Sequence, residues 1–347
     1  MPARGPLSSM QALQITAPRE TRLIDLAVPE PAAGQLLLHV RRVGYCGTDL
    51  STFEGRNPLV SYPRIPGHEI GATIASLGAS VGGAWATGQA VTVVPYQNCG
   101  HCAACRRGRG YACRNNQTLG VQRDGALQPF IVVPEEKLIA VPGLGVRELS
   151  LVEPLTVGFH AVARGDVAAG DVVAVFGCGL IGLGAVAGAA ERGATVIAID
   201  LDDGKLALAC RLGAAHGINA RTANLHDALQ AVTAGEGPDV CVEAAGHPVT
   251  YRQAVEEVAF TGRVICIGYA KEDVAFATRL FVQKELDLRG SRNASAEDFR
   301  RVAAYLARGG FPYDAVLTRE VPLAEAGAAL AAWSADPIKI TKISVVL

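Results

Sequence analysis

The feature that most constrains the fold is an uncharged stretch of nineteen residues, Val172 to Ala190, that contains five glycines. Its length is close to that of a membrane span, but glycines at this density suit a tight turn and close helix packing better than a lipid-facing helix. Apolar strands alternate with helical segments along this part of the chain, with strands predicted at Val172–Phe176, Thr195–Ile199, Val240–Glu243 and Val264–Ile267. This alternation predicts an α/β fold with a doubly wound, parallel Rossmann sheet and no membrane segment.

The first of these strands runs into Gly177-Cys178-Gly179-Leu180-Ile181-Gly182, which opens a helix of small residues. Glycines in this context let the backbone approach a pyrophosphate at the helix N-terminus, so Gly177, Gly179, Leu180, Ile181 and Gly182 are predicted to bind a dinucleotide.

Asp200 ends the second strand, where its carboxylate can accept hydrogen bonds from ribose hydroxyls and would repel a 2′-phosphate. Asp202 adds a second negative charge, so we expect NAD as the cofactor, with Lys205 also in reach of the ribose. The alternative for Asp200 is a strand-end residue that caps the next helix.

With 347 residues the chain is long enough for two domains. Residues 10–154 contain short β-branched runs and turn residues, which predict a β-rich domain with strands at Gln35–Val43, Glu69–Leu77, Gln89–Val94, Phe130–Val133 and Lys137–Val141. Residues 155–290 form the predicted dinucleotide domain. Residues 291–347, with a helix at Ala296–Ala307 and a β-branched end at Ile338–Val346, are expected to return to the first domain, and Met1–Ser9 is expected to be an unstructured extension.

Four of the nine cysteines, Cys99, Cys102, Cys105 and Cys113, lie within fifteen residues of one another. Their spacing, C-x2-C-x2-C-x7-C, can place four thiolates around one zinc ion, which predicts a closed structural site in a lobe at about residues 95–115. Disulfides are the alternative. The chain shows no signal peptide, so we expect reduced thiols and a cytoplasmic location.

A second group of metal-ligand types is spread over more of the sequence. Cys46, His68 and Glu69, together with Glu153, offer a thiolate, an imidazole and carboxylates. Three protein ligands with an exchangeable position are what a catalytic zinc requires. Asp49 is predicted to hold the His68 ring through its other nitrogen.

In order and spacing, these segments resemble the zinc-containing medium-chain dehydrogenases. The resemblance rests on Gly44–Asp49, Pro66–Glu69, the four-cysteine lobe and Glu153–Leu155, and it covers nearly all the chain from Met10 onward. It implies a GroES-like catalytic domain, zinc ligands at Cys46 and His68, two zinc ions per subunit and a homotetramer. It leaves open whether Glu69 or Glu153 is the third ligand.

Two further segments match the family less specifically. Gly262 to Gly268 resembles the strand near the nicotinamide, so Gly268 is expected to contact the cofactor, and Glu243 to Gly246 resembles the preceding turn. Many relatives carry a histidine where this chain has Ser51. Thr48 can still pass on the alcohol proton, and we expect a water chain through Glu153 or Ser51 to complete its path.

The loops Asn57–Pro66 and Gly290–Ala294 resemble those of polyol and hexonate dehydrogenases, including enzymes for L-gulonate, L-galactonate and L-idonate. A hexonate carboxylate calls for a guanidinium and amides, so Arg292 with Asn293, and secondly Arg56 with Asn57, are the candidate substrate residues. A net charge of −1 gives no reason to expect a nucleic-acid partner. The alternatives are a sorbitol- or threonine-type dehydrogenase, and a nucleotide-binding regulator without activity.

Overall fold

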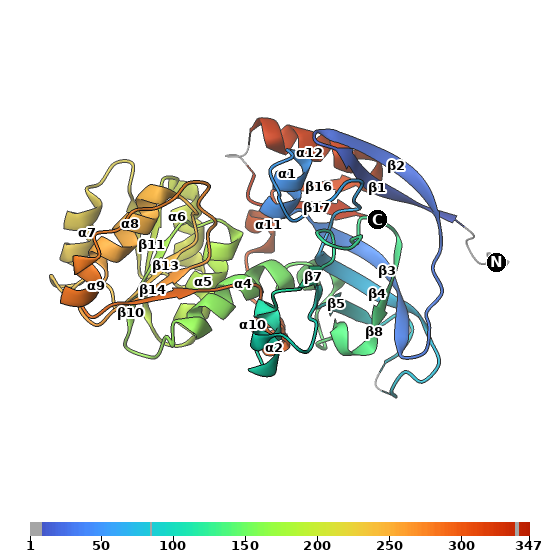
Figure 1. Cartoon of the computed structure of the whole chain (residues 1–347), viewed down its shortest axis with the longest axis horizontal. Helices are drawn as coiled ribbons and strands as arrows, with labels where there is room; N and C mark the ends of the chain where they lie inside the picture. The colour runs from blue at the N-terminus through green and yellow to red at the C-terminus, as the bar shows by residue number, and fades with distance from the viewer. Residues whose placement is uncertain (1–8, 84, 337–339) are drawn as a thin grey trace. The chain divides into compact units, whose positions relative to one another are not determined.

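The computed structural model describes residues 9–83, 85–336 and 340–347, which form two compact units. One unit consists of the described residues within Met1–Glu153 together with Ser295–Leu347, and the other is Pro154–Ala294. In Figure 1 the first unit contains both the blue N-terminal and the red C-terminal elements, and the second contains the yellow and orange ones.

The second unit is a six-stranded parallel sheet in the order β12-β11-β10-β13-β14-β15, which is a doubly wound Rossmann arrangement. The order reverses at β10, so the crevice at its carboxyl end is the expected ligand position in such a sheet. The strands are β10 Val172–Phe176, β11 Thr195–Asp200, β12 His216–Asn219, β13 Val240–Glu243, β14 Arg263–Cys266 and β15 Asp287–Gly290. The helices are α4 Val152–Arg164, which begins at the boundary, α5 Leu180–Glu191, α6 Asp203–Arg211, α7 Leu225–Val232, α8 Pro248–Glu257 and α9 Arg279–Gln283.

Glycines let helix α5 pack against its neighbours at very short range. A Cβ atom on Gly184 would lie 2.5 Å from the carbonyl oxygen of Leu155 in α4, and one on Gly158 of α4 would lie 2.2 Å from the amide nitrogen of Ala185. The glycines of the uncharged stretch therefore serve a buried helix, as their density predicted. No helix in the described part of the chain combines the length and hydropathy needed to cross a membrane.

The first unit is built on a seven-stranded sheet in the order β16-β17-β3-β4-β5-β9, with β8 also paired to β3. Two smaller sheets, β1-β2 and β6-β7, accompany it. The strands are β1 Ser9–Ala17, β2 Glu20–Ala27, β3 Gln35–Gly44, β4 Glu69–Leu77, β5 Ala90–Val93, β6 Tyr96–Gln97, β7 Gln117–Thr118, β8 Phe130–Pro134, β9 Leu138–Ile139, β16 Arg319–Pro322 and β17 Ile343–Val346. The helices are α1 Gly47–Phe53, α2 Ala103–Arg106, η1 Gly110–Ala112, η2 Glu135–Lys137, α3 Val146–Leu149, α10 Ala296–Ala307, α11 Tyr313–Val316, η3 Leu323–Glu325 and α12 Ala326–Ala335.

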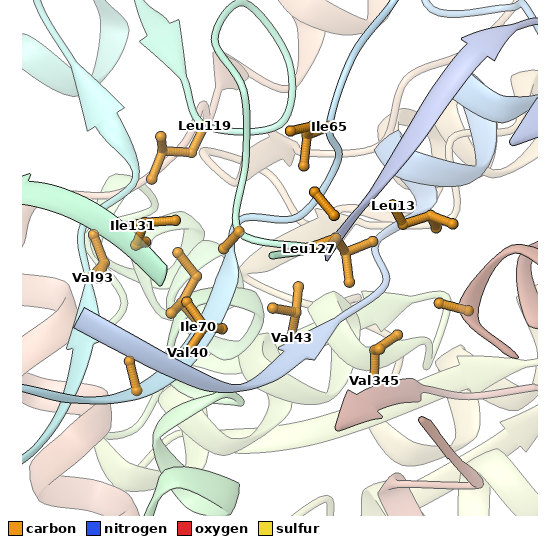
Figure 2. Close-up of a cluster of buried hydrophobic side chains, with 14 of the residues drawn as sticks. Leu13, Val40, Val43, Ile65, Ile70, Val93, Leu119, Leu127, Ile131 and Val345 are labelled. Atoms are coloured by element: carbon orange, nitrogen blue, oxygen red, sulfur yellow. The ribbon is translucent and has the colours of Figure 1, made fainter. Parts of the chain in front are cut away.

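A buried apolar cluster holds this unit together. Figure 2 shows side chains from β3, β4, β5, β8 and β17 pointing into one core, among them Val43, Ile70 and Val345. Strand β17 pairs antiparallel with β3, with Val345 opposite Val43, so the end of the chain completes a sheet begun near its start. Strand β3 alternates buried and half-buried residues, which is the pattern of a strand with one face in a core.

Most predicted elements are confirmed, and the exceptions lie at proline boundaries and exposed edges. The predicted strand Lys137–Val141 is wrong in extent, because Lys137 ends a 3-10 turn and only Leu138–Ile139 pairs, ahead of Pro142. The edge strands β12 and β15 escaped prediction because they carry few buried residues. Of the predicted terminal extension, Ser9 already belongs to β1, and the remainder lies outside the described residues, as does the start of the predicted strand Ile338–Val346.

Candidate functional site

Two neighbouring strand ends bring Cys46 and His68 together. Cys46 follows β3 and is the N-cap of α1, while His68 immediately precedes β4. Strands β3 and β4 are antiparallel, and Gly44 at the end of β3 lies opposite Glu69 at the start of β4. The residues that follow one strand therefore meet those that precede the other, across a gap of more than twenty positions in sequence.

The ligand atoms of Cys46, His68 and Glu69 all lie within 4.8 Å of one another. His68 and Glu69 are buried, at 5% and 0% exposure. A buried set of one sulfur, one imidazole nitrogen and one carboxylate oxygen matches the ligand chemistry of a zinc site with an exchangeable position. Of the two acids left open by the sequence, Glu69 is the one that belongs to this group among the described residues.

Glu153 is buried nearby but has a different partner. The hydroxyl of Tyr96 donates a hydrogen bond to its carboxylate, and both groups are buried. Burial raises the pKa of Glu153, and the charge of His68 opposes that rise. The sequence indicates Tyr96 only as part of the loop before the first cysteine of the lobe, with no functional role.

A buried lysine from the other end of the chain holds Glu69. The ammonium of Lys342 donates to both carboxylate oxygens at 2.7 Å and to the carbonyl oxygen of Tyr45 at 2.8 Å. Burial disfavours the charged form of Lys342, but Glu69 and Cys46 outweigh it and raise the lysine pKa. Gly44 leaves the room for this pair, because a Cβ there would lie 1.9 Å from Oε2 of Glu69.

Asp49 does not make the hydrogen bond predicted for it. Its carboxylate accepts backbone N–H groups of Cys46 at 2.9 Å and Gly67 at 3.2 Å, which fixes the loop on either side of the site. The distance from Asp49 Oδ1 to His68 Nδ1 is 4.0 Å, too long for a hydrogen bond, and Nδ1 is buried without a partner. Burial lowers the pKa of His68, but Asp49 and Cys46 raise it well above its usual value. Metal binding at this imidazole is therefore expected to release a proton.

Thr48 stands next to the thiolate in the first turn of α1. Its hydroxyl oxygen is 3.8 Å from the sulfur of Cys46. Ser51 is half-buried one turn further along the same helix. Helix α1 thus carries three hydroxyl groups that follow Cys46 in sequence, and the third, Thr52, donates to the carbonyl oxygen of Thr48.

The four cysteines of the lobe also converge. Their sulfur atoms lie within 4.8 Å of one another, with Cys102 to Cys105 and Cys113 to Cys99 both at 3.5 Å. A disulfide would require about 2.05 Å, so all four are free thiols. Sulfur atoms about 3.8 Å apart are what four zinc–sulfur bonds of about 2.3 Å in a tetrahedron produce. Backbone N–H groups of Cys105 and Arg114 lower the pKa of Cys102 to about 6, which favours a thiolate.

In the second unit, the glycine turn after β10 has the geometry that its sequence predicts. Gly177 has a φ of +91°, and a Cβ on Gly182 would lie 1.8 Å from the carbonyl oxygen of Gly177. By contrast, a Cβ on Gly179 would meet no described atom within 4 Å. Gly177 and Gly182 are therefore needed for the turn itself, and Gly179 leaves open space at the N-cap of α5, where Leu180 and Ile181 begin the helix.

Asp200 lies at the end of β11 beside this turn. Its carboxylate accepts the N–H of Cys178 at 2.7 Å and those of Leu201 and Asp202 at 2.7 and 3.1 Å. The helix cap considered as an alternative for Asp200 is made by Asp202, which accepts the N–H of Lys205 at 2.9 Å.

Gly268 follows β14 and packs against the turn after β13. A Cβ there would lie 2.3 Å from the amide nitrogen of Gly246 and 2.7 Å from Oε2 of Glu243. Glu243 accepts hydrogen bonds from the N–H groups of Ala245 and Gly246 and from the hydroxyl of Thr250. The segments matched to the family near the cofactor thus form one tight structure at the carboxyl ends of two strands.

The four candidate substrate residues divide between the units. Arg56 pairs with Glu54, and Asn57 hydrogen-bonds Thr52 Oγ1 and the N–H of Leu59, so both shape the loop after α1. Arg292 and Asn293 are half-buried in the segment that follows β15, and Asn293 has a left-handed φ of +52°.

A β-rich unit with a buried Cys-His-Glu group and a four-thiol lobe, in one chain with a doubly wound dinucleotide fold, defines a zinc-dependent dehydrogenase. Residues 32–143 match the alcohol dehydrogenase GroES-like domain, and residues 181–308 match the zinc-binding dehydrogenase domain. The chain belongs to the zinc-containing medium-chain alcohol dehydrogenase family, as the resemblance in its motifs indicated. It is an oxidoreductase, with zinc and NAD as its cofactors.

The relatives include L-galactonate-5-dehydrogenase of Escherichia coli K12, which is 33% identical over 92% of this chain and 93% of its own length. Among solved structures, the alcohol dehydrogenase rspB of Escherichia coli CFT073 complexed with NADH has a TM-score of 0.89 at 27% identity, covering 98% of this chain and 100% of that one. A zinc-binding dehydrogenase of Sinorhizobium meliloti 1021 bound to NADP has the same TM-score at 29% identity, with 98% and 100% coverage. Both dinucleotides therefore occur among the similar structures.

Proposed function

We propose that this enzyme oxidises a secondary alcohol of a sugar acid, a hexonate such as L-gulonate or L-galactonate, or of a related polyol, to the ketone with reduction of NAD. The observation that carries the reaction class is the convergence of Cys46, His68 and Glu69 in one buried group. The substrate class is supported by the similarity to L-galactonate-5-dehydrogenase over nearly the whole length of both chains.

In this proposal Cys46, His68 and Glu69 hold the catalytic zinc, and the four lobe cysteines hold a second, structural one. When bound, the catalytic zinc supplies a Lewis acid that lowers the pKa of the substrate hydroxyl, and NAD accepts the hydride. Lys342 orients Glu69 through its two short hydrogen bonds. Because Glu69 is so held, we place Glu153 outside the ligand set, bonded to Tyr96.

The hydroxyl of Thr48, which lies beside the Cys46 sulfur, accepts the proton of the substrate alcohol and passes its own proton on. Further transfer to solvent would use water with Glu153 or Ser51, since no histidine occupies the relay position. Glu153→Gln distinguishes these routes. A pH–rate profile of alcohol oxidation unchanged by that substitution would exclude the path through Glu153.

The choice of NAD over NADP rests on Asp200. Its negative charge lies at the carboxyl end of β11, the position where ribose hydroxyls are bound in this fold, and Asp202 and Asp203 follow at once. A 2′-phosphate placed there would meet three carboxylates, and the guanidinium of Arg221, which reaches the same segment, donates its Nε–H to the carbonyl oxygen of Leu201 at 3.3 Å.

The substrate proposal is tested by measuring NADH formation over a panel of stereoisomeric hexonates, their uncharged polyols and L-threonine, with zinc-loaded enzyme. Arg292→Ala and Arg56→Ala are expected to lower kcat/KM for a hexonate more than for its polyol, because a charged hydrogen bond to the carboxylate contributes about 1.5–3 kcal/mol. Arg107→Ala, on the exposed side of the lobe, is the control. If all three variants discriminate equally between the hexonate and its polyol, neither Arg292 nor Arg56 binds the substrate carboxylate. Turnover of sorbitol or L-threonine alone would reassign the substrate.

A homotetramer is the further expectation drawn from chain length and the family resemblance. Light scattering coupled to size-exclusion chromatography measures the assembly directly, and a monomeric mass would contradict it.

A further inference from the structure

A cavity of about 210 Å³ lies in the first unit, at the base of the four-cysteine lobe. Its walls come from β5, β8 and the short strand β6 that leads into the lobe. Val93 and Leu119, two of the apolar wall residues, belong to the buried cluster drawn in Figure 2. None of the candidate zinc ligands lines this cavity.

Two cationic side chains, Arg123 and Lys137, also line the cavity. One arm of the Arg123 guanidinium donates to Oε1 of Gln97, but its Nε is buried without a hydrogen-bond partner in the described structure. The ammonium of Lys137 has no hydrogen bond or ion pair with any described residue. Donors with unused hydrogen-bonding capacity therefore gather in one half-enclosed space.

The acidic groups nearby do not satisfy these donors. Asp124 lines the cavity, but Oδ1 of its carboxylate accepts from the guanidinium of Arg64 and from the N–H of Ile65, both at 3.1 Å. Glu136 is exposed and adjacent to Lys137 in sequence. The remaining hydroxyl in the wall, that of Tyr96, donates its hydrogen bond to the Glu153 carboxylate.

The arrangement is costly without a counter-ion. Burial lowers the pKa of Arg123, and burial with the charge of Arg123 lowers the pKa of Lys137 against the opposing effect of Glu136. Two partly desolvated cations of the same sign are destabilising unless a negative charge is placed between them. An oxyanion would accept hydrogen bonds from both and relieve the repulsion.

We propose that this cavity is a binding site for a small oxyanion, held by the Arg123 guanidinium and the Lys137 ammonium. The apolar wall residues Val93 and Leu119 fit the carbon body of a short organic carboxylate, while inorganic phosphate presents the same oxygen chemistry without that body. None of the candidate substrate or dinucleotide residues lines this cavity, and the proposal does not depend on the identity of the alcohol substrate.

The test is isothermal titration of the zinc-loaded enzyme, saturated with NAD so that the dinucleotide site is filled, at constant ionic strength. Inorganic phosphate is titrated in one arm and butyrate in the other. We expect saturable binding of one anion per chain, weakened about tenfold or more by Arg123→Gln or Lys137→Gln, which is the loss that one charge-assisted hydrogen bond gives. Tighter binding in one arm identifies the source of the oxyanion.

Arg107→Gln is the matched control, since this arginine is exposed on the same lobe and does not line the cavity. Arg123→Gln also removes the hydrogen bond to Gln97 and can disturb the lobe. Lys137→Gln then decides the test, because the Lys137 ammonium has no described partner to lose. The proposal is overturned if neither anion binds saturably up to about 10 mM, a range that covers millimolar dissociation constants. It is equally overturned if binding survives the Lys137 substitution or falls as much in the Arg107 control.

Discussion

Replacing Lys342 by Met tests how the buried carboxylate of the candidate zinc group is stabilised. The substitution keeps an unbranched apolar chain and removes the ammonium, so Glu69 loses two hydrogen bonds of 2.7 Å. The carbonyl oxygen of Tyr45 loses its 2.8 Å donor at the same time. Glu69 is fully buried and Lys342 is 5% exposed, so water cannot replace what is lost without opening the unit.

The expected cost in free energy of unfolding is about 3–5 kcal/mol, the range found when one partner of a buried ion pair is removed. Most of that cost is the carboxylate left unpaired in the interior. Neutralising it should therefore recover part of the loss, and Lys342→Met with Glu69→Gln is expected to cost about 1–3 kcal/mol less than the two single changes together.

The assay is urea unfolding followed by tryptophan fluorescence. Both tryptophans of the chain, Trp85 and Trp333, lie in the unit that contains Lys342, so the signal reports on that unit. Lys137→Met is the control, because it removes a half-buried lysine of the same unit that has no described partner, and it is expected to cost less than about 1 kcal/mol. Zinc content is measured for each variant, so that metal loss and loss of the ion pair are separated.

Stabilisation of Glu69 by Lys342 is refuted if Lys342→Met is no more destabilising than Lys137→Met. It is refuted also if the double substitution is additive within about 0.5 kcal/mol, since residues in direct contact should couple more strongly than that. Either result would mean that Glu69 is stabilised mainly by groups other than this lysine.

Three other predictions concern the dinucleotide unit. Gly182→Ala should lower the thermal stability of this unit, because the new Cβ would lie 1.8 Å from a carbonyl oxygen. Gly179→Ala should leave thermal stability intact and weaken NADH binding, which is measured by fluorescence titration. Equal effects of the two substitutions in both assays would contradict these separate roles of the two glycines. Asp200→Asn, which keeps a hydrogen-bond acceptor for the neighbouring N–H groups, should raise the ratio of kcat/KM for NADP to that for NAD about tenfold, and an unchanged ratio would remove this residue from the preference. Glu257 raises the pKa of exposed His226, so the ion pair stabilises the folded state below about pH 6.5 and loses that contribution as pH rises through the raised pKa. His226→Gln should therefore lower the melting temperature at pH 5.5 and not at pH 8.5. A difference in melting temperature that does not depend on pH would contradict this linkage.

The sequence determined the parts of this protein whose residues are close neighbours along the chain. The cysteine lobe and the glycine turn are contiguous motifs, and local spacing fixes which backbone and ligand geometries they can adopt. The buried strands β10 and β13 were predicted to the residue because each is an apolar run bounded by turn or polar positions. The order of these motifs along the chain was enough to indicate the family. The roles predicted for the substrate residues stay predictions.

Only the tertiary structure decided which carboxylate joins Cys46 and His68. Glu69 is adjacent to His68 in sequence, but its orientation depends on Lys342, 273 residues away, and on the absence of a side chain at Gly44. The partner of Glu153 is likewise a distant tyrosine, and the hydrogen bond expected from Asp49 is replaced by bonds to backbone amides. A buried charge takes whichever partner the packing of remote segments brings within about 3 Å, and no local pattern in the sequence records that choice.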